Sequence, residues 1–296
     1  MNKKTPSLFL LIIIFLQANQ LIGLCQSEND IRSALFWEIS GNELESPSYI
    51  YGTIHVMPKD EFKVFPSAEN KLKESDLLVM EINMDVPLKT KIEWAKKMML
   101  PADSTLQDYL SSDSYTKLKS FTIDSLGISK KKFERFTRLK PFAFYSALIP
   151  QIIDEKIEGY DMHFMKIAKK EDIPIAELEN FDFQMGIFDS IRYEDQLELF
   201  FEDFSHPAKD FDELLDIYKA QDIHKMAKMF DSGSDYEQFE YELITNRNQN
   251  WISKIEQFIQ DNKTFIAVGA GHLGGDKGII QLLMHEGYIL TPLSLE

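Results

Sequence analysis

The sequence contains a single cysteine, Cys25, among its 296 residues. A chain with one thiol can form no internal disulfide and no zinc site built from several cysteines. Long basic runs are also missing, and the formal net charge is −16 at pH 7. This balance argues against nucleic acid or an anionic membrane surface as a partner. A His-Glu-x-x-His segment is absent too, which excludes a metallopeptidase of the zincin type.

The most apolar stretch of the sequence lies at its N-terminus. Two lysines precede the uncharged run Leu8–Leu16, and polar residues follow it before Cys25. The run is too short to cross a bilayer, so the layout predicts a secretory signal peptide over residues 1–25. Cleavage after Cys25 would leave an exported protein over 26–296, periplasmic or secreted, with no transmembrane span. Lipidation of Cys25 is the second alternative, weakened by Leu24 where a small residue is expected, and an uncleaved anchor is the third.

Strand patterns occur near both ends of the remaining chain, and helical patterns fill the middle. Predicted strands are Ala34–Ile39, Ser48–Thr53, Leu77–Ile82, Pro174–Leu178, Thr264–Val268 and Tyr288–Leu293. Apolar residues at three- and four-residue spacing predict helices at Ser67–Ser75, Pro87–Met99, Ser112–Leu126, Lys130–Thr137, Phe142–Glu155, Tyr160–Lys170, Phe183–Phe204, Ala208–Phe230, Tyr236–Asn262 and Lys277–His285. We therefore expect one α/β (α+β) domain. Its central mixed sheet would be built from N- and C-terminal strands, with a large helical insertion between them.

Two strand ends carry the same four-residue pattern. Gly52-Thr-Ile-His55 follows one apolar strand, and Gly269-Ala-Gly-His272 follows another. A rigid strand fixes the position of the residue after it, and glycine lets the backbone turn and a ligand approach closely. Either pattern alone is an ordinary loop histidine. Two such patterns, each at the end of a predicted strand, instead predict one site that contains both histidines.

The second glycine loop also matches a nucleotide-binding pattern. Gly269-Ala-Gly-His-Leu-Gly274 fits G-x-G-x-x-G and lies between a predicted strand and a predicted helix. Only residues 275–296 follow it. That length holds one more helix and strand, with no room for the rest of a mononucleotide-binding unit. We therefore reject a dinucleotide cofactor.

Charged residues at other strand and helix positions are further candidates. Glu81 ends an apolar strand, and Glu179 comes directly after another. A carboxylate there is solvated, paired or bound to a metal, and each alternative is open for both residues. Arg247 lies one helical turn before Trp251, which fits either a surface cation–π pair or an arginine that holds a substrate anion. Asp161 opens a predicted helix, where it would serve as the N-cap.

Several of these segments together resemble the TraB/GumN family, which is related to the erythromycin-esterase/ChaN-like fold. The resemblance rests on seven segments that span nearly the whole chain after the signal. They are Phe36-Trp-Glu-Ile, Ser48–His55, Leu78-Val-Met-Glu81, Gly159-Tyr-Asp161, Ala176–Glu179 with Gln184, Arg247-Asn248 with Trp251, and Phe265–Gly275. Family members often have tyrosine where this chain has His163, so His163 is the weakest candidate. His206, His224 and His285 stand alone, and we assign them no role.

The family includes the animal Tiki proteins, which act as divalent-metal-dependent peptidases. The resemblance therefore implies a metal-dependent hydrolase that acts on peptides, with Mn²⁺, Co²⁺ or Zn²⁺ as cofactor. We expect His55, His272 and Glu81 to face the metal, with Glu81 as ligand or base. Glu179 would be a second catalytic carboxylate, and Arg247 would contact the substrate or an oxyanion.

Two other functions fit the same residues. The cleft could bind a peptide or an iron–tetrapyrrole without cleaving anything, as the relationship to ChaN suggests. It could also be a metal-independent, esterase-like hydrolase with histidine as base. Acidic neighbours and glycine turns beside both histidines favour catalysis, because haem sites usually place an axial ligand in an apolar pocket.

Overall fold

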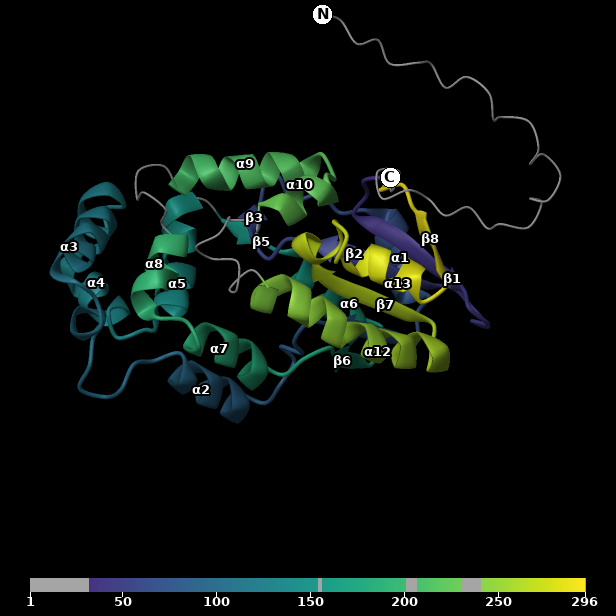
Figure 1. The fold of residues 1–296 in the computed structure, drawn as a ribbon, viewed down its shortest axis with the longest axis horizontal. Helices are drawn as coiled ribbons and strands as arrows, with labels where there is room; N and C mark the ends of the chain where they lie inside the picture. The colour runs from purple at the N-terminus through teal and green to yellow at the C-terminus, as the bar shows by residue number, and fades with distance from the viewer. Residues whose placement is uncertain (1–31, 154–155, 201–206, 230–240, 296) are drawn as a thin grey trace, which may run out of the picture. The chain divides into compact units, whose positions relative to one another are not determined.

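A six-stranded mixed sheet is the centre of the computed structural model, which describes residues 32–153, 156–200, 207–229 and 241–295 (Figure 1). Its strands are β1 (Phe36–Gly41), β2 (Ser48–Thr53), β4 (Leu77–Met80), β6 (Ile175–Glu177), β7 (Thr264–Gly269) and β8 (Tyr288–Pro292). In the order β6-β4-β7-β2-β1-β8, the first four strands run parallel, and β1 is antiparallel to both of its neighbours. The predicted α/β class is confirmed, with strands from both ends of the chain in one sheet.

The central strands are buried because their side chains are apolar on both faces. Val79 of β4 and Ile266 of β7 are paired with each other and fully buried. Such continuous apolar runs are typical of parallel strands that are covered on both sides. β1 and β2 form a hairpin, whose turn contains three residues of positive φ, at Gly41, Asn42 and Glu43.

Helices cover both faces of the sheet (Figure 1). On one face, α1 (Pro66–Lys73) and α6 (Tyr160–Lys170) pack on each other and on β7. On the other face lie α12 (Asn246–Asp261) and α13 (Ile279–His285), which bury isoleucine and leucine side chains. These four helices fix the positions of the strands and therefore of the residues that follow their ends.

The helical middle has an apolar core of its own, centred on Leu106, Phe133 and Phe144. Its helices are α2 (Leu88–Lys97), α3 (Ser112–Ser120), α4 (Lys130–Phe136), α5 (Pro141–Ile153), α7 (Phe181–Asp189), α8 (Tyr193–Phe200), α9 (Pro207–Lys219) and α10 (Ile223–Lys228). Short turns are η1 (Leu106–Asp108), η2 (Phe121–Ser125), η3 (Tyr241–Thr245) and η4 (Ala270–His272). The insertion is therefore a packed layer of its own between β4 and β7.

Two helices predicted as continuous are broken in the structure. The segment 183–204 divides into α7 and α8, because Ser190 ends the first helix. The segment 208–230 divides into α9 and α10, because Gln221 takes a positive φ of 57° and Asp222 caps the next helix through its side chain. Hydrophobic spacing runs through both breaks, so periodicity alone could not locate them.

A two-stranded sheet was not predicted from the sequence. β3 (Met57–Pro58) pairs with β5 (Ile157–Glu158) and so joins the loop after His55 to the start of α6. Gly159 follows β5, and a Cβ there would lie 2.0 Å from the His55 carbonyl oxygen. Only glycine allows the two backbones to come this close.

Residues Ser33–Glu296 form one compact unit. The predicted signal peptide with Cys25 lies outside the described residues, and so does His206. Within the described ranges, none of the helices combines the length and the apolar character needed to cross a membrane.

Candidate functional site

The predicted site residues follow the carboxyl ends of the four parallel strands. Glu179 comes after β6, Glu81 after β4, His272 after β7 and His55 after β2. Parallel neighbours end at one edge of a sheet, and the register places Thr53 beside Gly269. Ligands of open α/β sheets bind outside this edge. The topology therefore places four residues from distant parts of the sequence along one edge.

Arg247 of α12 lies between the two glutamates. Its Nη2 is 2.5 Å from Glu81 Oε2 and 2.7 Å from Glu179 Oε1, and its Nε donates to Glu179 at 3.0 Å. Its Nη1 donates to the Leu243 carbonyl at 2.9 Å and lies 3.2 Å from His272 Nε2. All five N–H donors of the guanidinium are thus engaged. Arg247 and both carboxylates are buried, so the cluster is a compact ion triad.

His272 is held at the end of β7 in one tautomer. Its Nδ1 lies 2.6 Å from Asn248 Oδ1, and the Asn248 amide nitrogen donates to the carbonyls of His272 and Lys277. Because that amide oxygen can only accept, Nδ1 of His272 carries the proton and Nε2 has the lone pair. Burial lowers the pKa of His272 to about 3, so the ring is neutral.

His55 is held by a different partner and is open to solvent. Its Nδ1 is 2.8 Å from Asp161 Oδ2, and the other Asp161 oxygen accepts from Thr53 Oγ1 at 2.9 Å. The Asp161 carboxylate raises the pKa of His55 to about 9, although the side chain is 67% exposed and solvent screens the pair. Within the described residues, no hydrogen bond or ion pair joins His55 to the buried triad.

The two glutamates have pKa values shifted in opposite directions. Burial raises the pKa of Glu81, but the charge of the Arg247 guanidinium outweighs it, and the net pKa is lowered. For Glu179, burial is the larger effect and Arg247 offsets it only in part, so the pKa is raised. Glu81 also accepts from the Gly269 N–H at 2.8 Å, and Glu179 from Trp251 Nε1 at 3.1 Å. Glu81 is therefore the carboxylate that stays ionised most easily.

Two residues of the site were not assigned their roles from the sequence. The prediction that Asp161 is the N-cap of α6 is wrong. Gly159 occupies that position, and Asp161 orients His55 instead. Asn248 orients His272 in the same way. The only available signal was their adjacency to Gly159-Tyr160 and to Arg247 in segments that carry the family resemblance.

Three of the remaining histidines, His163, His224 and His285, lie within the described residues and contact other partners. His163 Nε2 lies 2.8 Å from Glu69 on α1, and His285 Nε2 lies 2.8 Å from Gln281. His224 is near the backbone of Gly275. None of these contacts involves the strand-end residues.

Both site histidines have the chemistry of metal ligands. In each ring an acceptor holds Nδ1, so Nε2 is the nitrogen that would bind a metal. Nε2 of the neutral His272 ring has its lone pair, whereas His55, whose pKa is raised to about 9, must first lose a proton from Nε2. Among the residues that the structure describes, however, no three His, Cys, Asp or Glu side chains are grouped so as to hold an ion. Arg247 engages both His272 and Glu81, so an ion would have to compete with its guanidinium. The types of donor atom therefore suit a divalent ion, and Arg247 is the cation with which that ion would compete for His272 and Glu81.

The fold and the strand-end cluster define an α/β protein with its site at the carboxyl edge of a mixed sheet. The sequence signature of the TraB/PrgY/gumN family matches residues 35–292, and the chain belongs to this family. Metalloprotease TIKI1 of Danio rerio is 23% identical over 322 residues, a match covering 88% of this chain and 63% of that protein. The chain thus spans less than two thirds of that relative's length. No solved structure matches the chain.

Proposed function

We propose that this chain is an exported, divalent-metal-dependent hydrolase that acts on peptides. The observation that carries the proposal is the matched presentation of two imidazoles at neighbouring strand ends. Asp161 holds Nδ1 of His55, and Asn248 holds Nδ1 of His272, so Nε2 is the nitrogen through which each ring, once neutral and released from other partners, could bind a metal. The likeness to a protein named a metalloprotease supports the same activity. Export is proposed from the signal-peptide pattern of residues 1–25.

His55, His272 and Glu81 would hold the ion. When bound, Mn²⁺, Co²⁺ or Zn²⁺ supplies a Lewis acid that polarises a peptide carbonyl and lowers the pKa of water in the site. Imidazole and carboxylate ligands suit all three ions. Asp161 and Asn248 act as positioning residues, because each fixes the tautomer and orientation of one ring.

The carboxylates supply the proton transfers. Glu81, which its lowered pKa keeps ionised, would accept a proton from the attacking water where it is not itself a ligand. The lowered pKa also makes it a weak base, so this role requires that Arg247 release it first. Water adds hydroxide to the carbonyl carbon while the C–N bond breaks, and the amine leaves with the proton. Glu179 is the second carboxylate at the site. Arg247 keeps the two carboxylates in place and contacts substrate only after its present partners release it.

Metal analysis of the purified protein tests the proposal directly. We expect about one equivalent of Mn²⁺, Co²⁺ or Zn²⁺ in wild type and much less in His55→Ala and His272→Ala. His285→Ala is the matched control, because His285 lies on α13 and pairs with Gln281, away from the strand-end residues. Peptide cleavage, followed by mass spectrometry with added Mn²⁺ or Co²⁺, should be lost in the two site variants and kept in the control.

Two outcomes would contradict the mechanism. Equal metal content in all four proteins would remove the histidines from the metal site. Cleavage that survives both site substitutions would remove them from catalysis. A visible absorption spectrum with a haem-type band would instead identify a binding protein for an iron–tetrapyrrole.

A further inference from the structure

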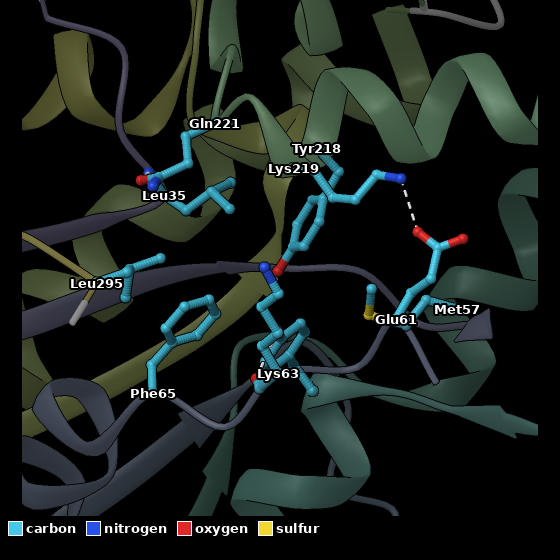
Figure 2. Close-up of a pocket in the computed structure, with 10 residues that line it drawn as sticks. Leu35, Met57, Glu61, Lys63, Phe65, Tyr218, Lys219, Gln221 and Leu295 are labelled. Carbon is cyan, nitrogen blue, oxygen red and sulfur yellow. Dashed lines mark hydrogen bonds and ion pairs between the residues drawn. The ribbon is translucent and has the colours of Figure 1, made fainter. Parts of the chain in front are cut away.

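A pocket of about 230 Å³ is lined by Leu35 before β1, Met57 of β3 and Tyr218 of α9, among others (Figure 2). Its inner wall is apolar and consists of Leu35, Met57, Phe65, Tyr160 and Leu295. Leu35, Met57 and Tyr160 are buried, so this wall is fixed by the core. Small-molecule sites usually occupy about 300–1,000 Å³. The pocket is therefore sized for one large side chain rather than for a whole cofactor.

The pocket lies on the same edge of the sheet as the strand-end site. Leu35 directly precedes β1, and its carbonyl accepts from the Gly52 N–H at 2.7 Å. Leu295 follows β8, which runs in the same direction as β2 because both are antiparallel to β1. Tyr218 Oη donates to the Gly52 carbonyl at 3.0 Å. Two residues of the lining, Leu35 and Tyr218, thus bond to the glycine of the turn that carries His55.

Other contacts join the pocket to the partner of His55. Tyr160 is adjacent to Asp161, whose carboxylate holds the His55 ring. Met57 lies two residues after His55 and pairs in β3 with Glu158. A ligand in the pocket would therefore lie close to the loop that carries His55, the exposed histidine of the site.

The rim of the pocket carries two lysines, Lys63 and Lys219, of which only Lys219 has an ion-pair partner among the described residues. Lys219 pairs with Glu61 at 2.6 Å, as Figure 2 shows, and with Asp216 at 3.0 Å. Lys63 forms no ion pair within the described residues, and its carbonyl accepts from Tyr160 Oη at 2.8 Å. The chain as a whole has a net charge of −16. A cation above an apolar wall is thus a local feature that selects a ligand with an apolar body and an anionic group.

We infer that this pocket binds the apolar last residue of a peptide, with its side chain on the wall and its free carboxylate on Lys63. The inference rests on the proposed peptide hydrolysis and names its substrate class. Such binding would place the peptide bonds near the C-terminus beside His55. Hydrolysis there consumes one water, transfers hydroxide to the carbonyl carbon and a proton to the amine, and releases a short C-terminal fragment.

Equilibrium binding tests the pocket without any need for cleavage. The probes are N-acetyl-L-phenylalanine, its amide and N-acetylglycine, titrated into the full chain by calorimetry or followed by NMR. Because a charge-assisted hydrogen bond distinguishes acid from amide, the acid should bind about tenfold or more tightly than the amide. Lys63→Met should remove that preference. Lys59→Met should retain it, because Lys59 is a nearby exposed lysine outside the pocket that pairs with Glu158.

A second variant tests the apolar wall. Leu295→Trp adds bulk at a half-buried position of the lining and should weaken the phenylalanine acid and its amide alike. The inference is overturned if wild type binds acid and amide equally, if the preference survives Lys63→Met, or if N-acetylglycine binds as tightly as the phenylalanine acid. These measurements do not depend on Lys63 contributing to the fold.

Cleavage assays separate this inference from the proposed function. With added Mn²⁺, a peptide that ends in phenylalanine should be cleaved with about tenfold higher kcat/KM as the free acid than as the amide, and Lys63→Met should abolish the difference. Cleavage without an acid preference overturns the pocket's role and leaves the hydrolase proposal intact. An acid preference in binding, with no cleavage of any peptide, overturns the hydrolase proposal and supports the pocket.

Discussion

Arg247 offers the sharpest test of how the site is stabilised, because it neutralises two buried carboxylates at once. In Arg247→Met the side chain keeps its apolar stem and loses its charge. Glu81 then keeps only the Gly269 N–H, and Glu179 keeps only the Trp251 indole N–H, as close donors. Removal of one partner from a buried ion pair costs about 3–5 kcal/mol, because the other charge is left uncompensated. We expect the free energy of unfolding to fall by about that amount.

Urea unfolding followed by circular dichroism would measure this change. Since single domains are stable by about 5–15 kcal/mol, the variant should remain measurable at low temperature. The matched control is Lys140→Met, which breaks an ion pair between Lys140 and Asp189 at 2.6 Å near the surface. Exposed pairs contribute about 0–1 kcal/mol, so the control should differ little from wild type.

A compensating variant decides whether charge is the cause. Arg247→Met combined with Glu81→Gln and Glu179→Gln removes all three charges and leaves polar groups of similar size. Replacement of a whole buried ion cluster by neutral groups is often close to neutral, so the triple variant should recover most of the lost stability. The reasoning is refuted if Arg247→Met is no more destabilising than Lys140→Met, or if the triple variant is no more stable than the single one.

Three smaller perturbations test other parts of the site. Asp161→Asn removes the anion that orients His55 and should weaken Mn²⁺ binding about 10- to 100-fold in calorimetry; an unchanged affinity would rule out the positioning role. Gly159→Ala places a Cβ 2.0 Å from the His55 carbonyl oxygen and should lower the free energy of unfolding. Gly186 lies within α7, where an added Cβ would meet no neighbouring atom within 4 Å, so Gly186→Ala should raise the free energy of unfolding by about 0.5–1 kcal/mol. The opposite order would contradict the close approach at Gly159. His272 has a pKa of about 3 in the folded chain against an ordinary 6.5, so unfolding takes up a proton between these values. Stability should therefore fall as the pH drops below 6.5, by up to about 1.4 kcal/mol per pH unit, and urea titrations of His272→Asn should lack this part of the slope. An identical slope in that variant would show that His272 does not cause it.

The strand framework and the strand-end residues could be predicted because their signals are local. Apolar runs identify β4 and β7, and the Gly-x-x-His pattern identifies the turns after β2 and β7. Parallel strands then end at one edge by topology, which brings Glu81, Glu179 and His272 into one cluster with Arg247. This inference follows from the direction of the strands and does not depend on how far apart the residues are in the sequence.

The partners of the histidines could not be predicted, because they depend on packing between distant segments. Asp161 lies 106 residues from His55 in the chain, and its helix position alone suggested an N-cap. Asn248 meets His272 only because α12 packs beside η4. Arg247 was expected to contact substrate, and only the packed structure shows that both glutamates and a backbone carbonyl already use its donors. Side-chain pairing of this kind is a tertiary property.

These contacts divide the residues at this edge of the sheet into a buried cluster and an exposed histidine. Arg247, Glu81, Glu179 and His272 are all buried and mutually bonded, so changes there act first on stability and on the charge of the site. His55 is 67% exposed, so a substrate of the proposed reaction would meet it before it met the buried cluster. If the ion-binding proposal holds, Arg247 must loosen its hold on His272 before the two histidines can share an ion. The strength of the buried triad would then set how readily the exposed half of the site becomes active.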